Sequence, residues 1–114
     1  MPAGNYDFTC EQGAKFEKRL RVTTSSEPLD FSGFTAAMHV RYRYEATDFL
    51  VELTTENGLI VLGGAAGTVD LTIPSETTAT IPKSGVYDIE ITDEGGEVHR
   101  LLKGQFVLDK EVTR

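Results

Sequence analysis

The chain has 114 residues, of which 39% are hydrophobic and 25% charged, and its formal net charge is −7. This is the composition of a globular domain, and no apolar run approaches the roughly 20 residues that a membrane-spanning helix needs. The negative charge disfavours binding to nucleic acid phosphates. We therefore predict one domain over residues 1–114, with neither a membrane nor a nucleic acid as its main partner.

Residues 1–5 lack the basic start and the apolar segment of a secretory signal, so we expect the protein to be made in a cytoplasm. The single cysteine, Cys10, cannot form an internal disulfide, and it alternates with Tyr6 and Phe8 in a strand pattern. Free cysteines are commonly buried. Cys10 is therefore predicted to be a core residue rather than a nucleophile.

The next two strand candidates span residues 16–22 and 34–44. In the first, Lys18 interrupts the apolar face, which indicates either an edge strand or a side chain whose stem covers the core while its ammonium group reaches water. The second is the longest candidate. Its even-numbered residues are predicted to face inwards: Phe34, Ala36, Met38, Val40, Tyr42 and Tyr44.

Turn signals divide the middle of the chain. The pair Asn57 and Gly58 accepts positive φ angles and predicts a tight hairpin between strands at 50–55 and 59–62. A glycine-rich link at 63–67 precedes a strand at 68–73, for which a further hairpin is expected. Ser75 is placed to cap one helical turn before Pro82, and this turn would cross from one sheet to the other.

The clearest strand spans residues 84–92, where Gly85 follows a turn and Tyr87, Ile89 and Ile91 share one face. A tyrosine at this place is typical of the corner tyrosine of immunoglobulin-like sandwiches, whose ring packs inwards while its hydroxyl bonds backbone. A turn at 93–96 leads to strands at 97–102 and 105–108, which are separated by Gly104. The pattern predicts an all-β fold, a single immunoglobulin-like antiparallel sandwich with one short helical turn.

No set of residues carries a catalytic or metal site at the right spacing. His39 and His99 lie on separate predicted strands without further histidine or cysteine ligands. The acidic loop at 93–97 lacks the spaced oxygen ligands of a calcium loop, and no serine or cysteine has a base beside it. We expect no enzyme activity, no metal and no cofactor.

A positive strip is the main surface candidate. Arg41 and Arg43 are predicted on the outer face of the long strand, with His39 beside them, in an otherwise acidic protein. Such a strip suits docking to an acidic partner. The alternative is a solvated face whose charges are balanced across strands by glutamates such as Glu52.

The order of these segments resembles a family of small virion proteins of tailed bacteriophages, each made of one immunoglobulin-like sandwich. The resemblance covers nearly the whole chain, and the segments that carry it are 6–8 with 12–13, 29–34, 55–58, 67–73, 85–90, 100–104 and 111–114. It implies a structural protein present in many copies at the neck, tail or baseplate, which docks fibres or neighbouring subunits and needs no cofactor. Cys10 and Lys18 depart from the pattern.

Two further expectations follow from this resemblance. Contact with virion neighbours is expected through an edge strand, at 16–22 or 105–108, or through a terminal arm, at 1–5 or 110–114, with Arg114 in the latter. The competing interpretations are a host-surface or carbohydrate-binding adhesin and, further off, a hydrolase inhibitor or an enzyme. An adhesin should expose clustered aromatic residues, whereas Tyr42, Tyr44, Phe49 and Tyr87 are interpreted as core.

Overall fold

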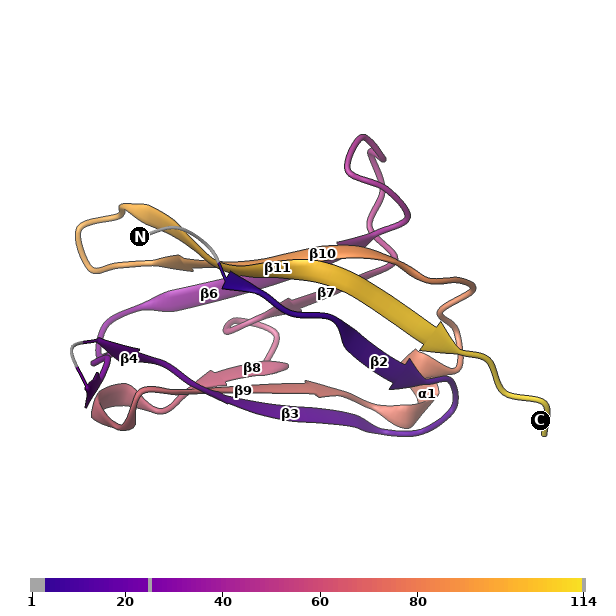
Figure 1. Ribbon diagram of the computed structural model, residues 1–114, viewed down its shortest axis with the longest axis horizontal. Coiled ribbons are helices and arrows are strands. Elements are labelled where there is room, and N and C mark those ends of the chain that lie inside the picture. The colour runs from indigo at the N-terminus through magenta and orange to yellow at the C-terminus, as the bar shows by residue number, and fades with distance from the viewer. Residues whose placement is uncertain (1–3, 25, 114) are drawn as a thin grey trace.

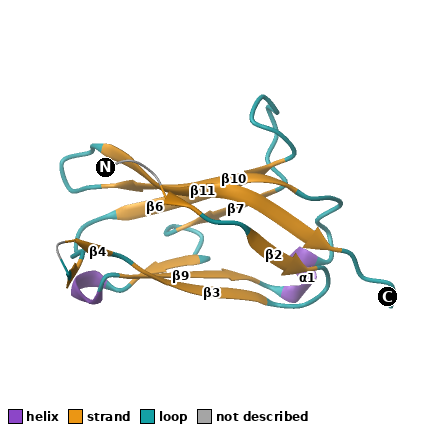
Figure 2. Ribbon diagram, in the orientation of Figure 1, coloured by secondary structure: helices purple, strands orange, loops and turns teal. Residues whose placement is uncertain are grey.

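Alternating apolar and polar residues build two β-sheets that pack face to face with their apolar side chains between them (Figure 1). The computed structural model describes residues 4–24 and 26–113. Helix is confined in the described chain to the 3₁₀ turn η1 (Gly64–Ala66) and the α-helical turn α1 (Ser75–Thr78), as Figure 2 shows. Neither of these turns has the length or the apolar character needed to span a membrane.

The larger sheet runs in the order β1–β11–β10–β6–β7, and β2 also pairs with β11. Its antiparallel members are β6 (Thr35–Arg41), β7 (Val51–Thr54), β10 (Gly85–Thr92) and β11 (Val98–Asp109). Two short strands, β1 (Gly4–Asn5) and β2 (Phe8–Glu11), lie parallel to β11. The first two strands of the described chain are thus bonded to its last strand.

The smaller sheet has the order β3–β9–β8 and is antiparallel throughout. Its strands are β3 (Phe16–Arg21), β9 (Thr68–Ile73) and β8 (Ile60–Leu62). A short separate pair joins β4 (Thr23–Thr24) to β5 (Glu27–Pro28). The hairpin expected around the 63–67 link is confirmed as the β8–β9 pair, and Lys18 lies on an edge strand, the first of the two alternatives for it.

This arrangement is the immunoglobulin-like all-β sandwich that the sequence predicts. The central strands β6, β10 and β11 occupy the places of strands C, F and G, and β3, β9 and β8 those of B, E and D. The parallel pairings of β1 and β2 are exceptions to the antiparallel prediction. The expected helical turn is α1, which joins β9 to β10 across the two sheets, and η1 adds a second turn.

One cluster of buried residues fills the space between the sheets. Cys10 belongs to it with 1% of its surface exposed, as predicted. Tyr87 also belongs to it, and its ring centroid lies 4.9 Å from that of Phe8. The Tyr87 hydroxyl donates a hydrogen bond to the Tyr6 carbonyl oxygen. Tyr87 therefore packs inwards and bonds backbone as predicted, and the backbone it bonds belongs to the N-terminal segment.

The last strand differs from the prediction because Gly104 does not divide it. β11 is continuous over Val98–Asp109, with a shift in register between Ile89 and Glu90 of β10 that leaves Leu101 unpaired with β10. A Cβ atom at Gly104 would lie 2.0 Å from the Tyr6 carbonyl oxygen. The glycine therefore allows the β1–β2 segment to pass close to β11. Gln105 and Phe106 pair with β10, and residues 106–108 pair with β2, so β11 lies within the sheet here and the assignment of 105–108 to an edge strand was wrong.

The predicted hairpin at Asn57 and Gly58 was also wrong, since β7 and β8 belong to different sheets. Gly58 does adopt a positive φ of 82°, while Asn57 is not among the described residues with positive φ. The Asn57 side chain instead closes the crossing: its Oδ1 accepts hydrogen bonds from the Thr54 and Leu59 amides, each at 3.0 Å. Asn57 and Gly58 thus form a turn, as predicted, but this turn connects the two sheets and not two strands of one hairpin.

Two capping and length predictions need correction. The Ser75 side chain does not cap α1, whose N-cap position is Pro74 without a side-chain bond. β6 ends at Arg41 instead of continuing to Tyr44, because its pairing with β10 ends at the pair of Arg41 and Val86, near the start of β10. Beyond that pair no strand of the described residues pairs with 42–44, and Tyr42 and Tyr44 are 52% and 72% exposed.

Candidate docking surface

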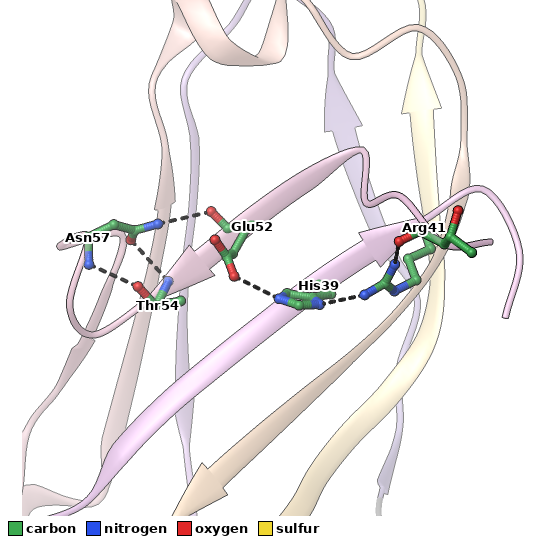
Figure 3. Close-up of polar contacts among 6 residues, drawn as sticks. His39, Arg41, Glu52, Thr54 and Asn57 are labelled. Carbon is green, nitrogen blue, oxygen red and sulfur yellow. Dashed lines mark hydrogen bonds and ion pairs between the residues drawn. The ribbon is translucent and has the colours of Figure 1, made fainter. Parts of the chain in front are cut away.

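The side chains of the predicted positive strip form a network across β6 and β7. His39 Nε2 lies 2.8 Å from Glu52 Oε2 on the neighbouring strand, and its Nδ1 lies 3.0 Å from Arg41 Nη2. Arginine nitrogens only donate, so Nδ1 accepts and the proton sits on Nε2, from which it is donated to the Glu52 carboxylate. Figure 3 shows this line of contacts across the two strands. The predicted balance of the strip by Glu52 is therefore present.

The Arg41 side chain forms hydrogen bonds with other residues of the same chain. Its Nη1 donates to the carbonyl oxygens of Ala46 at 3.1 Å and Thr47 at 2.9 Å. These residues lie in the connection between β6 and β7, residues 42–50, which we call the β6–β7 loop. The loop rises from the larger sheet on the side away from the smaller sheet (Figures 1 and 2). Arg41 therefore braces the base of the projecting loop from the sheet.

The opposite end of the network is the Asn57 turn. Asn57 Nδ2 donates to the Glu52 carbonyl oxygen at 3.1 Å, and its backbone amide donates to Thr54 Oγ1 at 2.9 Å (Figure 3). The polar contacts thus continue from this turn through Glu52 and His39 to the β6–β7 loop. These contacts fix the loop before β7 and the turn after it, so the short edge strand β7 is held in place on both sides.

The β6–β7 loop carries exposed aromatic residues. Tyr42, Tyr44 and Phe49 are 52%, 72% and 46% exposed. Their interpretation as core was therefore wrong, and only Tyr87 of that group is buried. Two cations lie over the Tyr42 ring, Lys83 Nζ at 3.9 Å from the centroid and the guanidinium carbon of Arg43 at 5.9 Å. The Phe49 ring packs beside that of His39, with centroids 5.1 Å apart.

Next to the loop, the outer face of the larger sheet is hollowed into an open groove of about 340 Å³. Tyr44 lines it at the loop end, and the lining includes charged side chains from three strands: Arg41, Asp88, Glu90 and Arg100. Arg100 Nε lies 3.4 Å from Asp88 Oδ2, so part of this charge is compensated within the groove. The groove therefore combines one exposed ring with both hydrogen-bond donors and acceptors.

The β10–β11 turn brings Asp93, Glu97 and His99 together, with one ligand atom of each within 4.8 Å of the others. Asp93 Oδ1 accepts from the amides of Gly95 at 2.9 Å and Glu97 at 3.0 Å, while His99 Nε2 lies 3.4 Å from Asp93 Oδ2. These bonds, with that to the Glu97 amide first, lower the pKa of Asp93. The cluster is explained as the closure of the hairpin turn.

The remaining predicted residues are spread over the fold. Gly85 is buried at the start of β10, where a Cβ atom would lie 2.2 Å from the Arg41 carbonyl oxygen. The structure thus brings Gly85 to the same end of β6 as the loop, whereas Tyr87, Asn57 and Gly58 serve the core and the sheet crossing. Arg114, the fourth predicted docking residue, lies outside the described residues.

The sequence did not identify Tyr42, Tyr44, Phe49, Lys83 and Arg100 as surface residues of this site. The alternation of residues 34–44 concealed Tyr44, because periodicity does not show where a partner strand stops pairing. One signal was available: the chain reversal expected at 45–48, where Thr47 and Asp48 are common in turns, limits how far a strand can continue. Lys83 and Arg100 come from other segments, and only the fold brings them near.

No protein-family model matches the chain, and no curated protein matches it either.

Proposed function

We propose that this domain is a non-enzymatic structural module of a tailed-phage virion, present in many copies at the neck, tail or baseplate, and that its β6–β7 loop docks a neighbouring protein subunit. The observation that carries the proposal is the exposure of Tyr42, Tyr44 and Phe49 on a loop braced from the sheet. Tyrosine, phenylalanine and arginine are enriched in protein interfaces. The family resemblance of the sequence supplies the virion as the setting.

Rigidity and charge support the same use of the loop. Arg41 fixes two loop carbonyls, so docking requires less ordering of the backbone than a loose loop would. Arg43 is exposed, and no hydrogen bond or ion pair joins its side chain to another described residue. Together with Lys83 it places positive charge beside the aromatic rings. A partner surface with acidic residues around an apolar pocket would complement this loop.

Two experiments test this proposal. Antibodies against the domain should label purified virions in regular positions, and their absence from the particle would overturn the virion assignment. Tyr44→Ala and Arg43→Glu should each reduce incorporation into particles about tenfold, which corresponds to about 1.4 kcal/mol of binding energy. Both residues are exposed, so the free energy of unfolding should change by less than about 0.5 kcal/mol.

The matched control is Val61→Ala, which shortens an apolar side chain of β8 that is 56% exposed on the other sheet. It should incorporate like the parent protein. Normal incorporation of both loop variants would remove the loop from the interface even if the domain is present in the virion. The two parts of the proposal are therefore tested separately.

A carbohydrate-binding adhesin is the second candidate, and the groove is what favours it. Sugar rings stack on exposed aromatic faces and bond to carboxylate and guanidinium groups, and Tyr44, Asp88, Glu90 and Arg100 offer both chemistries around a space of about 340 Å³. This space is at the lower end of the sizes of small-molecule sites. Titration with host-surface oligosaccharides should then shift the NMR signals of these residues, and Tyr44→Ala should abolish the shifts. Unchanged spectra would exclude this candidate.

A further inference from the structure

Strand β3 leaves one edge of the smaller sheet open. It pairs with β9 on one side and with no other described strand (Figure 1). Its predecessor β2 would be the usual neighbour, because consecutive strands commonly pair, but β2 pairs with β11 of the larger sheet. The outer backbone N–H and C=O groups of β3 therefore have no strand partner within the described chain. Such an edge is a template for a further strand.

The turn between β2 and β3 holds β2 away from this edge. The Gly13 amide donates to Thr78 Oγ1 at 3.0 Å, and this hydroxyl donates to the Ala14 carbonyl at 2.8 Å. Gln12 Nε2 donates to the Ile81 carbonyl oxygen at 2.9 Å. Moving β2 onto β3 would break these bonds and the pairing with β11. The open edge is therefore a stable feature of the fold.

Basic residues gather on this strand in a protein of net charge −7. Arg19 is committed to Asp70, with Nε–Oδ1 and Nη2–Oδ2 distances of 2.7 and 2.9 Å. The side chains of Lys18 and Arg21 are exposed and make no hydrogen bond or ion pair with another residue of 4–24 or 26–113, although the charge of Arg21 helps to lower the pKa of Asp70. Lys18 lies opposite the buried Leu71, on the core side of the sheet, so its cation projects at the open edge.

A second copy of the chain is a poor occupant of this edge. When two copies of β3 pair antiparallel about a two-fold axis, the central residue lies opposite itself. Centres at 17, 18 and 19 place Glu17, Lys18 and Arg19 against themselves, and a centre at 20 places Arg19 against Arg21. Like charges directly opposite each other destabilise a sheet. Centres at 18 and 19 also place Glu17 opposite Arg19 or Arg21, but Arg19 is committed to Asp70 and each register keeps a like-charged pair at its centre. Symmetric pairing therefore matches the charges of β3 less well than an acidic strand would.

We propose that β3 accepts an extended acidic segment of a protein partner as an added strand of the smaller sheet. This inference rests on the proposed role as a docking module, but it concerns the other sheet and a different contact. Backbone hydrogen bonds to the free edge would supply affinity, and opposite charges would supply specificity. An antiparallel occupant needs acidic residues opposite Arg21 and Lys18, three positions apart, with an apolar residue opposite Leu20 between them.

The probe follows from this register. A peptide of sequence Thr-Glu-Val-Thr-Glu-Thr-Val places its first glutamate opposite Arg21 and its second opposite Lys18. Added to the complete protein at up to millimolar concentration, it should slow hydrogen exchange of β3 amides that do not face β9. The control peptide Thr-Lys-Val-Thr-Lys-Thr-Val has the same length and β-propensity and should bind at least tenfold more weakly.

Variants distinguish peptide binding at β3 from docking through the β6–β7 loop. Lys18→Glu with Arg21→Glu should weaken the acidic peptide at least tenfold, while Arg43→Glu on the β6–β7 loop should leave its binding unchanged. Equal binding of the two peptides, protection confined to another strand, or no protection of β3 at millimolar peptide would overturn the inference. Dimerisation of the free protein through β3 would overturn it too. None of these outcomes bears on incorporation through the loop.

Discussion

At the scale of single residues, Tyr87 connects β10 to the N-terminal segment of the described chain. Its ring packs against Phe8 in the core, and its hydroxyl donates to the Tyr6 carbonyl at the point where β1 gives way to β2. Burial, followed by the nearby Asp7, raises the pKa of Tyr87, so its hydroxyl remains protonated and donates throughout the physiological range. One late side chain therefore fixes the N-terminal strands on the sheet.

Tyr87→Phe should lower the free energy of unfolding by about 1 kcal/mol, because it removes one hydrogen bond. Tyr87→Ala should lower it by about 3–5 kcal/mol, because it also empties an aromatic core site. Denaturant melts measure both. Tyr44→Phe, the same change at an exposed tyrosine, should stay within about 0.5 kcal/mol of the parent. A Tyr87→Ala protein that melts like the parent would contradict this role.

Cys10 should resist alkylation in the native protein. Its thiol is 1% exposed, and burial, with a smaller contribution from Glu11, raises its pKa to about 11. The thiolate is the reactive form, so it is scarce near neutral pH. Iodoacetamide labelling followed by mass spectrometry should show slow reaction in buffer and complete reaction in denaturant. Rapid native labelling would show that the strand β2 opens readily from β11.

At the scale of elements, periodicity predicted the strands well and their ends and partners poorly. The alternation of 84–92 identified β10 and its buried face because both neighbours, β6 and β11, cover it fully. Residues 42–44 continue the alternation of β6, but no described strand pairs with them, so they leave the sheet. Asn57 and Gly58 specify a turn, but turn chemistry does not state which sheet the next strand joins. For these reasons the sequence alone did not predict that the aromatic residues of the β6–β7 loop are exposed.

Gly104 shows why a glycine within a strand can be misinterpreted as a break. Gly104→Ala should lower the free energy of unfolding by about 1–3 kcal/mol, because the added Cβ would meet the Tyr6 carbonyl at 2.0 Å and force the crossing segment to shift. Gly95→Ala is the control, since its Cβ would lie 3.4 Å from the nearest atom, Asp93 Oδ1. Equal denaturation midpoints for the two variants would mean that β1 and β2 are not held closely to β11.

At the scale of the whole molecule, the two sheets offer different contacts. The larger sheet ends in the aromatic β6–β7 loop, and the smaller sheet ends in the basic edge strand β3. The loop serves the docking that we propose for this domain, and the edge strand serves the added strand, so the two proposed contacts do not overlap. The acidic remainder of the surface keeps free copies apart in solution.

Acid should destabilise the molecule through aspartates on several elements. The pKa values of Asp30, Asp70 and Asp93 are all lowered, chiefly by hydrogen bonds from Ser32, from Arg19 and from the Glu97 amide respectively. A carboxyl group with a lowered pKa in the folded state stabilises the fold above its unfolded pKa of about 3.9. That contribution is lost as the pH falls through the lower folded value. Urea midpoints should therefore be steady from about pH 7 to 5 and fall below about pH 4.

Asp93→Asn isolates one of these contributions. Asparagine keeps an oxygen that can accept from the Gly95 and Glu97 amides, but it carries no charge to titrate. The variant should be less stable than the parent at neutral pH, should lose less stability on acidification, and should approach the parent at the lowest pH. Asp48→Asn, at an exposed aspartate that makes no hydrogen bond with another described residue, should reproduce the parent profile. If Asp93→Asn follows the parent curve at every pH, the carboxylate does not hold the β10–β11 turn, and the acid sensitivity must then come from other groups.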